Sequence, residues 1–196
     1  MKLAECVENH RKVQGWIDQQ LSGLPYPNSV RNRLACACFD MVLEHYKAIT
    51  ELANLGLPGS GFSLSRLLFE SYVRGVWLSR CASDTEVSRY ERDRLDKRMH
   101  ELIADVEKTE GFESQVLSKA KSRTWKPLNS LTHSGYQQLA RRFNGNVQEP
   151  NYSDSDQFLL LNHAKALALL AVHMVALVSE NAELEKAVSA KAGLEL

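Results

Sequence analysis

The chain has 196 residues, of which 44% are hydrophobic and 24% are charged, and its 24 basic and 24 acidic side chains give a formal net charge of zero. A chain of this length and composition can form one globular domain with a continuous core, without disulfide or metal cross-links. The neutral balance argues against a strongly basic nucleic-acid-binding module, although not against a local basic patch.

Helical periodicity dominates the sequence, and strand signals are nearly absent. The segments predicted to be helical share a stripe of apolar residues at helical spacing; in chain order they are 2–21, 29–55, 63–82, 84–110, 112–123, 130–142 and 154–187. Asn28 or Ser29 can cap the second helix, and Ser83 with Glu86 forms a capping-box pattern at the start of the fourth.

These segments predict an all-α fold, an antiparallel up-and-down bundle of six to seven helices. Short connections, several of them containing Gly or Pro, separate the helices. No internal repeat and no convincing domain boundary interrupts the chain. Residues 1–196 are therefore expected to form a single helical domain with a frayed tail at 188–196.

Nothing in the sequence predicts a secreted or membrane-bound protein. The N-terminus interrupts its apolar residues with charges and so lacks the apolar region of a signal peptide. The longest apolar stretch, 166–178, is too short to span a bilayer and contains His173. The four cysteines form no C-x-x-C pair and are expected to be reduced thiols. We expect a cytoplasmic protein without a metal or a cofactor.

Helix 63–82 carries a ladder of charges in an otherwise apolar segment. Arg66, Glu70 and Arg74 recur every four residues and fall within an arc of about 80° on the helix surface. A helix that is apolar on its other sides belongs in the middle of a bundle, where charges need partners. The ladder is a structural set of ion pairs with Glu70 bonded to Arg66 or Arg74, a cleft that binds a phosphate group, or a solvated face of the helix.

The stretch SLTHSGYQQLARR (130–142) is the second candidate for chemistry. His133 is expected at or near a helix start, with Gln137 and Arg141 on roughly the same side. A histidine beside arginines suits RNA phosphodiester cleavage, which needs a base for the 2′-hydroxyl and cations for the phosphorane. The alternative is a histidine that only caps or hydrogen-bonds a neighbouring turn.

The stretch LSRLLFESYVRGVWL (64–78), followed later by LTHSG (131–135), resembles uncharacterised bacterial all-α families related to the HEPN superfamily. The resemblance covers about residues 60–142. It implies a small helical domain that binds RNA or a nucleotide in phage defence or toxin–antitoxin systems. It also implies a homodimer and, if the protein is an enzyme, a metal-independent ribonuclease.

The nuclease signature of such families is an arginine followed, a few residues later, by a histidine. The match in this chain is Arg94 with His100, and it lacks the polar residue that usually follows the arginine. Among the arginines and histidines of this chain, about one such match is expected by chance. The segment around it is better explained as a solvated, charged helix.

Two functions are compatible with these patterns. The first is an RNA-binding or RNA-cleaving bundle; its expected site residues are His133 and Glu70 as catalytic groups, and Arg66, Arg74 and Arg141 as phosphate-binding or anion-binding groups. The alternative is a catalytically inert dimeric interaction module in which the Arg-Glu-Arg ladder is structural.

The two functions differ in the geometry that they require. A joint site needs the His133 and Arg66 side chains within about two helical turns of each other. We expect this proximity, with 112–123 acting only as a bend, so that helices 63–82 and 130–142 start at the same end of the bundle.

Overall fold

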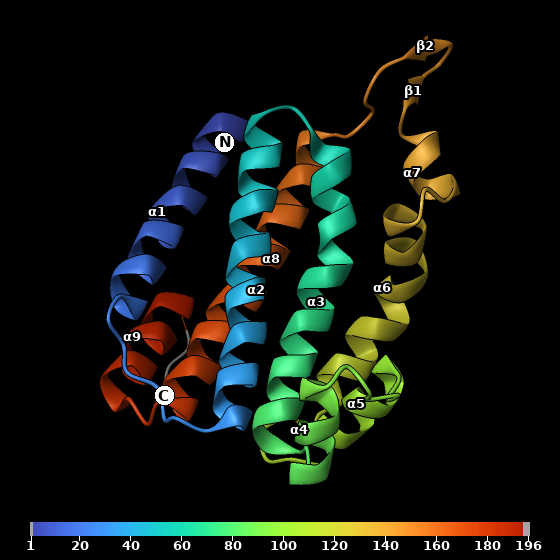
Figure 1. The fold of residues 1–196 in the computed structure, drawn as a ribbon. Helices are drawn as coiled ribbons and strands as arrows, with labels where there is room; N and C mark the ends of the chain where they lie inside the picture. The colour runs from blue at the N-terminus through green and yellow to red at the C-terminus, as the bar shows by residue number, and fades with distance from the viewer. Residues whose placement is uncertain (1, 194–196) are drawn as a thin grey trace.

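The computed structural model describes residues 2–193, and most of them are helical (Figure 1). The helices in this part of the chain are α1 (Leu3–Leu21), α2 (Val30–Asn54), α3 (Pro58–Arg80), α4 (Asp84–Glu91), α5 (Met99–Val106), α6 (Val116–Thr132), α7 (Tyr136–Ala140), α8 (Asp154–Val178) and α9 (Ala182–Ala192). Two short antiparallel strands, β1 (Phe143–Asn144) and β2 (Val147–Gln148), form a hairpin between α7 and α8. The prediction of a helical bundle is confirmed, but the nine helices within residues 2–193 exceed the six to seven predicted.

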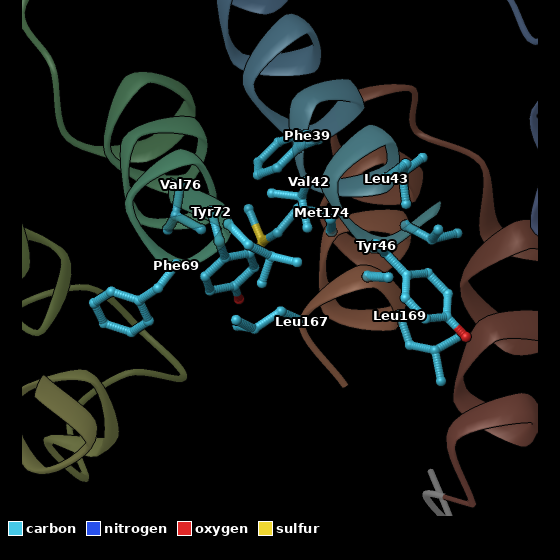
Figure 2. Packing of buried hydrophobic residues seen from close by; sticks show 14 of the residues in the cluster. Phe39, Val42, Leu43, Tyr46, Phe69, Tyr72, Val76, Leu167, Leu169 and Met174 are labelled. Carbon is cyan, nitrogen blue, oxygen red and sulfur yellow. The ribbon is translucent and has the colours of Figure 1, made fainter. Parts of the chain in front are cut away.

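The core lies where α2, α3 and α8 meet, and Figure 2 shows the aromatic and aliphatic side chains that these helices contribute. Helix α3 is buried on most of its circumference, as expected for the segment 63–82. Gly75 allows the close approach of α2, because a Cβ atom at this position would lie 2.5 Å from Cε1 of Phe39. Phe39 is completely buried, so the ring has no free space into which to move.

Capping patterns in the sequence predicted several helix starts correctly. The Ser29 side chain accepts the N–H of Asn32 at the start of α2, as predicted. Ser83 and Glu86 form the predicted capping box at the start of α4. Helix α3, however, begins at Pro58 and not at residue 63, because a proline fits the first position of a helix, where no N–H is needed.

The prediction of one charged helix from 84 to 110 is wrong, since α4 and α5 are separated by an irregular segment. Within that segment Asp93 adopts a left-handed backbone conformation with φ of 52°. The segment offers little apolar surface to bury, so packing does not hold it in a helix. Lys97 instead connects the two helices, with its Nζ 2.7 Å from Glu86 Oε1 and 2.6 Å from Asp105 Oδ2.

The predicted helix 154–187 is likewise divided, into α8 and α9. Glu180 has a φ of 53°, and the Asn181 side chain accepts the N–H of Leu184 to start α9. Helix α9 continues to Ala192 with Val188 buried, so this part of the expected tail at 188–196 is helical. Residues 194–196 lie outside the described residues.

Helix α8 is long and apolar enough to cross a membrane by length and composition alone. In its most apolar window, however, 56% is buried inside the bundle. Core helices of soluble proteins pass the same length and composition test, so this helix is weak evidence for a membrane span.

Candidate functional site

Arg66 is the centre of a polar cluster between α3 and α6. Its Nε donates a hydrogen bond of 2.8 Å to Glu70 Oε1, and its Nη1 contacts Asn129 Oδ1. The same Nη1 lies 3.0 Å from His133 Nε2, and the guanidinium carbon lies 4.6 Å from the centroid of the Trp125 ring. One guanidinium therefore joins a carboxylate, an amide, an imidazole and an indole. The predicted pairing of Glu70 with Arg66 is confirmed.

The pair is only partly buried. The side chains of Arg66 and Glu70 are 20% and 19% exposed, and the side chain of His133 lies at the surface. The negative charge of Glu70 balances the guanidinium, so the cluster holds its cation without a bound anion. This geometry fits the structural interpretation of the ladder for Arg66 and Glu70, while His133 stays accessible from outside.

Helix α6 brings His133 to Arg66 by a route that differs from the prediction. The expected helices 112–123 and 130–142 are replaced by one helix that continues through Pro127 to Thr132, followed by the single turn of α7. His133 is the C-cap residue of α6 and does not lie at a helix start. Helix α6 runs antiparallel to α3, so its end, not its start, meets the first turns of α3 (Figure 1).

Direct contacts between the two helices fix this end of α6. The Ser63 hydroxyl donates a hydrogen bond of 2.8 Å to the Leu131 carbonyl, and the Thr132 hydroxyl donates one of 3.2 Å to the Ser63 carbonyl. Gly135 lets the chain turn immediately afterwards, because a Cβ there would lie 2.5 Å from Oγ of Ser130. These contacts place His133 beside Arg66 even though its own side chain is exposed.

The contact with Arg66 determines which nitrogen of the His133 ring carries a proton. A guanidinium has only N–H donors, so Nε2 of His133 must accept the hydrogen bond. The imidazole is therefore neutral and carries its proton on Nδ1. In this arrangement the ring can donate a hydrogen bond through Nδ1 but has no free lone pair for use as a base.

Arg74 and Arg141, the other two predicted anion-binding residues, lie apart from this cluster. Arg74 forms no ion pair with Glu70 within residues 2–193; it lies near the Cys38 thiol, where burial raises the pKa of Cys38 and the arginine opposes that rise. Arg141 binds Asp156, with 2.8 Å between Nη1 and Oδ2. This hydrogen bond lowers the pKa of Asp156. Arg141 thus acts as an ion-pair partner that ties α7 to α8.

The segment 116–148, which comprises α6, α7, β1 and β2 and is called the basic arm below, carries a strong local charge. From residue 114 to residue 148 the sequence has six basic residues and no acidic residue. All 24 acidic residues therefore lie outside this stretch, together with only 18 of the basic ones. The basic residues of the arm are Lys119, Lys121, Arg123, Lys126, Arg141 and Arg142.

Most of these charges face solvent without a counter-charge. Among the residues that the structure describes, only Arg141 of the six forms an ion pair with a carboxylate. Lys119, Arg123, Lys126 and Arg142 are exposed. The sequence analysis missed this feature because it used the charge of the whole chain, where an acidic remainder cancels the arm. A search for long stretches without Asp or Glu would have found it.

The basic arm also exposes aromatic and aliphatic side chains. Tyr136 is 81% exposed, and Phe143 is 50% exposed at the base of the hairpin. Figure 1 shows the hairpin extending away from the bundle, and neither ring belongs to the hydrophobic core. Cations interleaved with accessible aromatic rings are typical of surfaces that bind single-stranded nucleic acid.

Arg94 and His100 line different cavities. Arg94 lies in the irregular segment between α4 and α5, and His100 lies on α5. Within residues 2–193, no group of three or more His, Cys, Asp or Glu residues could hold a metal ion.

The chain matches a known protein family. The model of a family described as a family of unknown function (DUF6988) matches residues 39–193, which include α3, the Arg66 cluster and the basic arm. No curated protein and no solved structure matches the chain.

Proposed function

The chain belongs to the family of unknown function DUF6988, and we propose that this member binds single-stranded RNA along the basic arm. The observation that carries the proposal is the absence of any acidic residue between positions 114 and 148, combined with six basic residues. Such a surface attracts the phosphate backbone without regard to sequence. The resemblance of residues 60–142 to HEPN-related families supports RNA as the nucleic acid.

The dimensions of the arm suit an extended strand. Helix α6 has 17 residues and is therefore about 25 Å long, which covers several consecutive phosphates. Lys119, Arg123 and Lys126 recur along it at spacings of four and three residues, so they share one side of the helix. Beyond α6, the exposed Tyr136 ring offers a platform on which a base can stack.

We assign the Arg66 cluster a supporting role in this function. Arg66 is already bonded to Glu70, and the lone pair of His133 Nε2 is already used. His133 is left with an Nδ1 proton that can be donated to a phosphate oxygen. This arrangement favours binding of the strand over its cleavage, because a general base needs a free lone pair.

The proposal is tested by fluorescence anisotropy with a labelled single-stranded RNA. The charge-reversal variant K119E/R123E/R142E should bind at least about tenfold more weakly than the unmodified protein, and affinity should fall steeply between about 50 and 200 mM salt. The matched control is K12E/R33E/R80E, which makes the same change of charge at exposed positions on α1, α2 and α3. The control should bind within about threefold of the unmodified protein.

Four outcomes would contradict the proposal. Absence of RNA binding by the unmodified protein would overturn it, and an equal loss in both variants would mean that only the overall charge matters. Tighter binding of DNA of the same sequence would contradict the assignment to RNA. Recovery of shortened RNA after incubation would contradict binding without cleavage and favour a ribonuclease.

A second candidate function, a dimeric interaction module, is favoured by the outer side of α8. Its seam consists of Leu159, His163, Ala166, Leu170, His173 and Leu177, whose spacing alternates between four and three residues. Leu159 is 68% exposed and Leu170 is 41% exposed. A seam with this spacing is typical of helices that pack against an identical helix, so we propose a second copy of this chain as the partner.

Light scattering after size exclusion tests the second candidate. The unmodified protein should have the mass of a dimer, and L159E/L170E should have the mass of a monomer with an unchanged helical circular dichroism spectrum. The control L55E/L57E changes two exposed leucines next to the α2–α3 connection and should remain dimeric. A monomeric unmodified protein at high concentration would remove this candidate.

A further inference from the structure

A cavity between α5 and α6 opens beside the Arg66 cluster and has a volume of about 290 Å³. Its walls include His100 and Ile103 from α5, and Ser118, Lys121, Trp125 and Lys126 from α6. This volume is close to the lower limit of small-molecule sites, about 300 Å³. The cavity can therefore hold a small planar group but not a helix or a folded RNA.

The lining of the cavity combines an aromatic wall with cations. Trp125 is half-buried and presents the apolar surface of the cavity, whereas Ile103 is almost fully buried. Lys121 and Lys126 supply positive charge, and no Asp or Glu lines the cavity. The Ser118 hydroxyl is already used, because it donates a hydrogen bond to Glu107. A ligand that suits these walls is planar, aromatic and anionic.

Trp125 links this cavity to the Arg66 cluster. The Arg66 guanidinium lies over the Trp125 ring, and Lys121 Nζ lies 5.0 Å from the centroid of the same ring. Because Glu70 and Asn129 hold Arg66 in place, the indole is held in one orientation before any ligand binds. A ring fixed in advance loses little conformational entropy on stacking.

We propose that this cavity accepts one unstacked nucleobase of the bound strand. The base packs against Trp125, and Lys121 and Lys126 contact the phosphate next to it. This inference rests on the proposed function, and it adds that the protein requires a base that is free of pairing. It therefore assigns the ligand as a single strand, since a base in a duplex cannot reach the cavity.

The experiment compares two strands of equal length, one ordinary RNA and one sugar-phosphate backbone without bases. The unmodified protein should bind the ordinary strand at least about fivefold more tightly, because base stacking on an aromatic ring contributes about 1–3 kcal/mol. W125L should lose most of this preference for the ordinary strand. The control W16L changes a half-buried tryptophan on α1 that also lies under a lysine, and it should keep the preference.

A second variant separates the cavity from the stability of the Arg66 cluster. S122W adds a bulky ring to the cavity from the exposed side of α6 and leaves Trp125 and its contact with Arg66 in the chain, so it should also lose most of the preference for the ordinary strand. Equal binding of the two strands by the unmodified protein would overturn the cavity assignment and leave the basic arm intact. Binding of neither strand would overturn the proposed function itself. Retention of the preference in S122W would also contradict the cavity assignment.

Discussion

Arg66 Nη1 lies 3.0 Å from His133 Nε2, although the two residues are 67 positions apart in the chain. This contact joins the most buried helix of the bundle to the end of the most basic one. Because Arg66 also binds Glu70 on its own helix, the ion pair within α3 becomes part of the attachment of the basic arm. A change at Arg66 should therefore affect both the stability of the bundle and the position of the arm.

We expect R66A to destabilise the protein by about 2–4 kcal/mol, because it leaves the partly buried Glu70 carboxylate without its cation. Urea unfolding followed by circular dichroism measures this loss. The matched control is R74A, one turn beyond Glu70 on the same helix, where no carboxylate partner is lost within the described residues. It should cost less than about 1 kcal/mol. Equal losses in the two variants would show that the Arg66–Glu70 pair contributes nothing of its own.

The His133 ring should be found as the tautomer with its proton on Nδ1, since Nε2 accepts from Arg66. Long-range nitrogen–proton NMR correlation distinguishes the two tautomers. In R66A the donor is absent, and the signal should move toward the mixture seen for free histidine, in which the Nε2–H form dominates. A dominant Nε2–H form in the unmodified protein would mean that the contact does not exist in solution.

Part of the Arg66 cluster could be predicted from the sequence, but the path of the chain that brings His133 to it could not. The pairing of Arg66 with Glu70 follows from a spacing of four residues on a single helix, so it needs no knowledge of the fold. The position of His133 depends on whether α6 continues through Pro127, which locally costs about 3 kcal/mol. Buried Leu117 and Leu131 hold α6 on both sides of the proline. Tertiary packing of this kind overrides the local signal.

The breaks in the other two predicted helices follow the same rule. At Asp93 and at Glu180 the backbone adopts a left-handed conformation, which aspartate tolerates better than most residues but which is uncommon for glutamate. The breaks depend on where α5 and α9 pack and not on a glycine or a proline. By contrast, the starts at Ser29 and Ser83 depend on a hydrogen bond within three residues, and they could be predicted.

Two glycine substitutions should have opposite effects on stability, because only Gly75 lies at the contact between α2 and α3. G75A places a methyl group within 2.5 Å of the buried Phe39 ring and should destabilise the protein by about 1–3 kcal/mol. G15A is the matched control, because Gly15 lies in α1, where an added Cβ atom would meet no packing partner within 4 Å. It should stabilise the protein by about 0.5–1 kcal/mol through helix propensity. Thermal unfolding of both variants tests the pair, and a stable G75A would mean that the helices pack less closely.

The buried His10 predicts how stability depends on pH. Its Nδ1 lies 2.8 Å from the Tyr46 hydroxyl, and its side chain is almost inaccessible to water. Burial lowers the pKa of His10 to about 4, and the nearby Lys165 ammonium acts in the same direction. The ordinary pKa of histidine, about 6.5, applies in the unfolded chain. Between these two values the unfolded state binds more protons than the folded state.

The free energy of unfolding should therefore be constant above about pH 6.5 and decrease as the pH falls toward 4, by at most about 1.4 kcal/mol per pH unit from this group. Urea unfolding at pH 7.5 and pH 5 measures the decrease. In H10Q, whose amide can still bond Tyr46 but cannot be protonated, the decrease should be smaller. A remainder is expected, because burial also lowers the pKa of His45. H100Q, at an exposed position on α5, is the control and should keep the full decrease. If H10Q and the unmodified protein lose stability equally, protonation of His10 is not linked to folding.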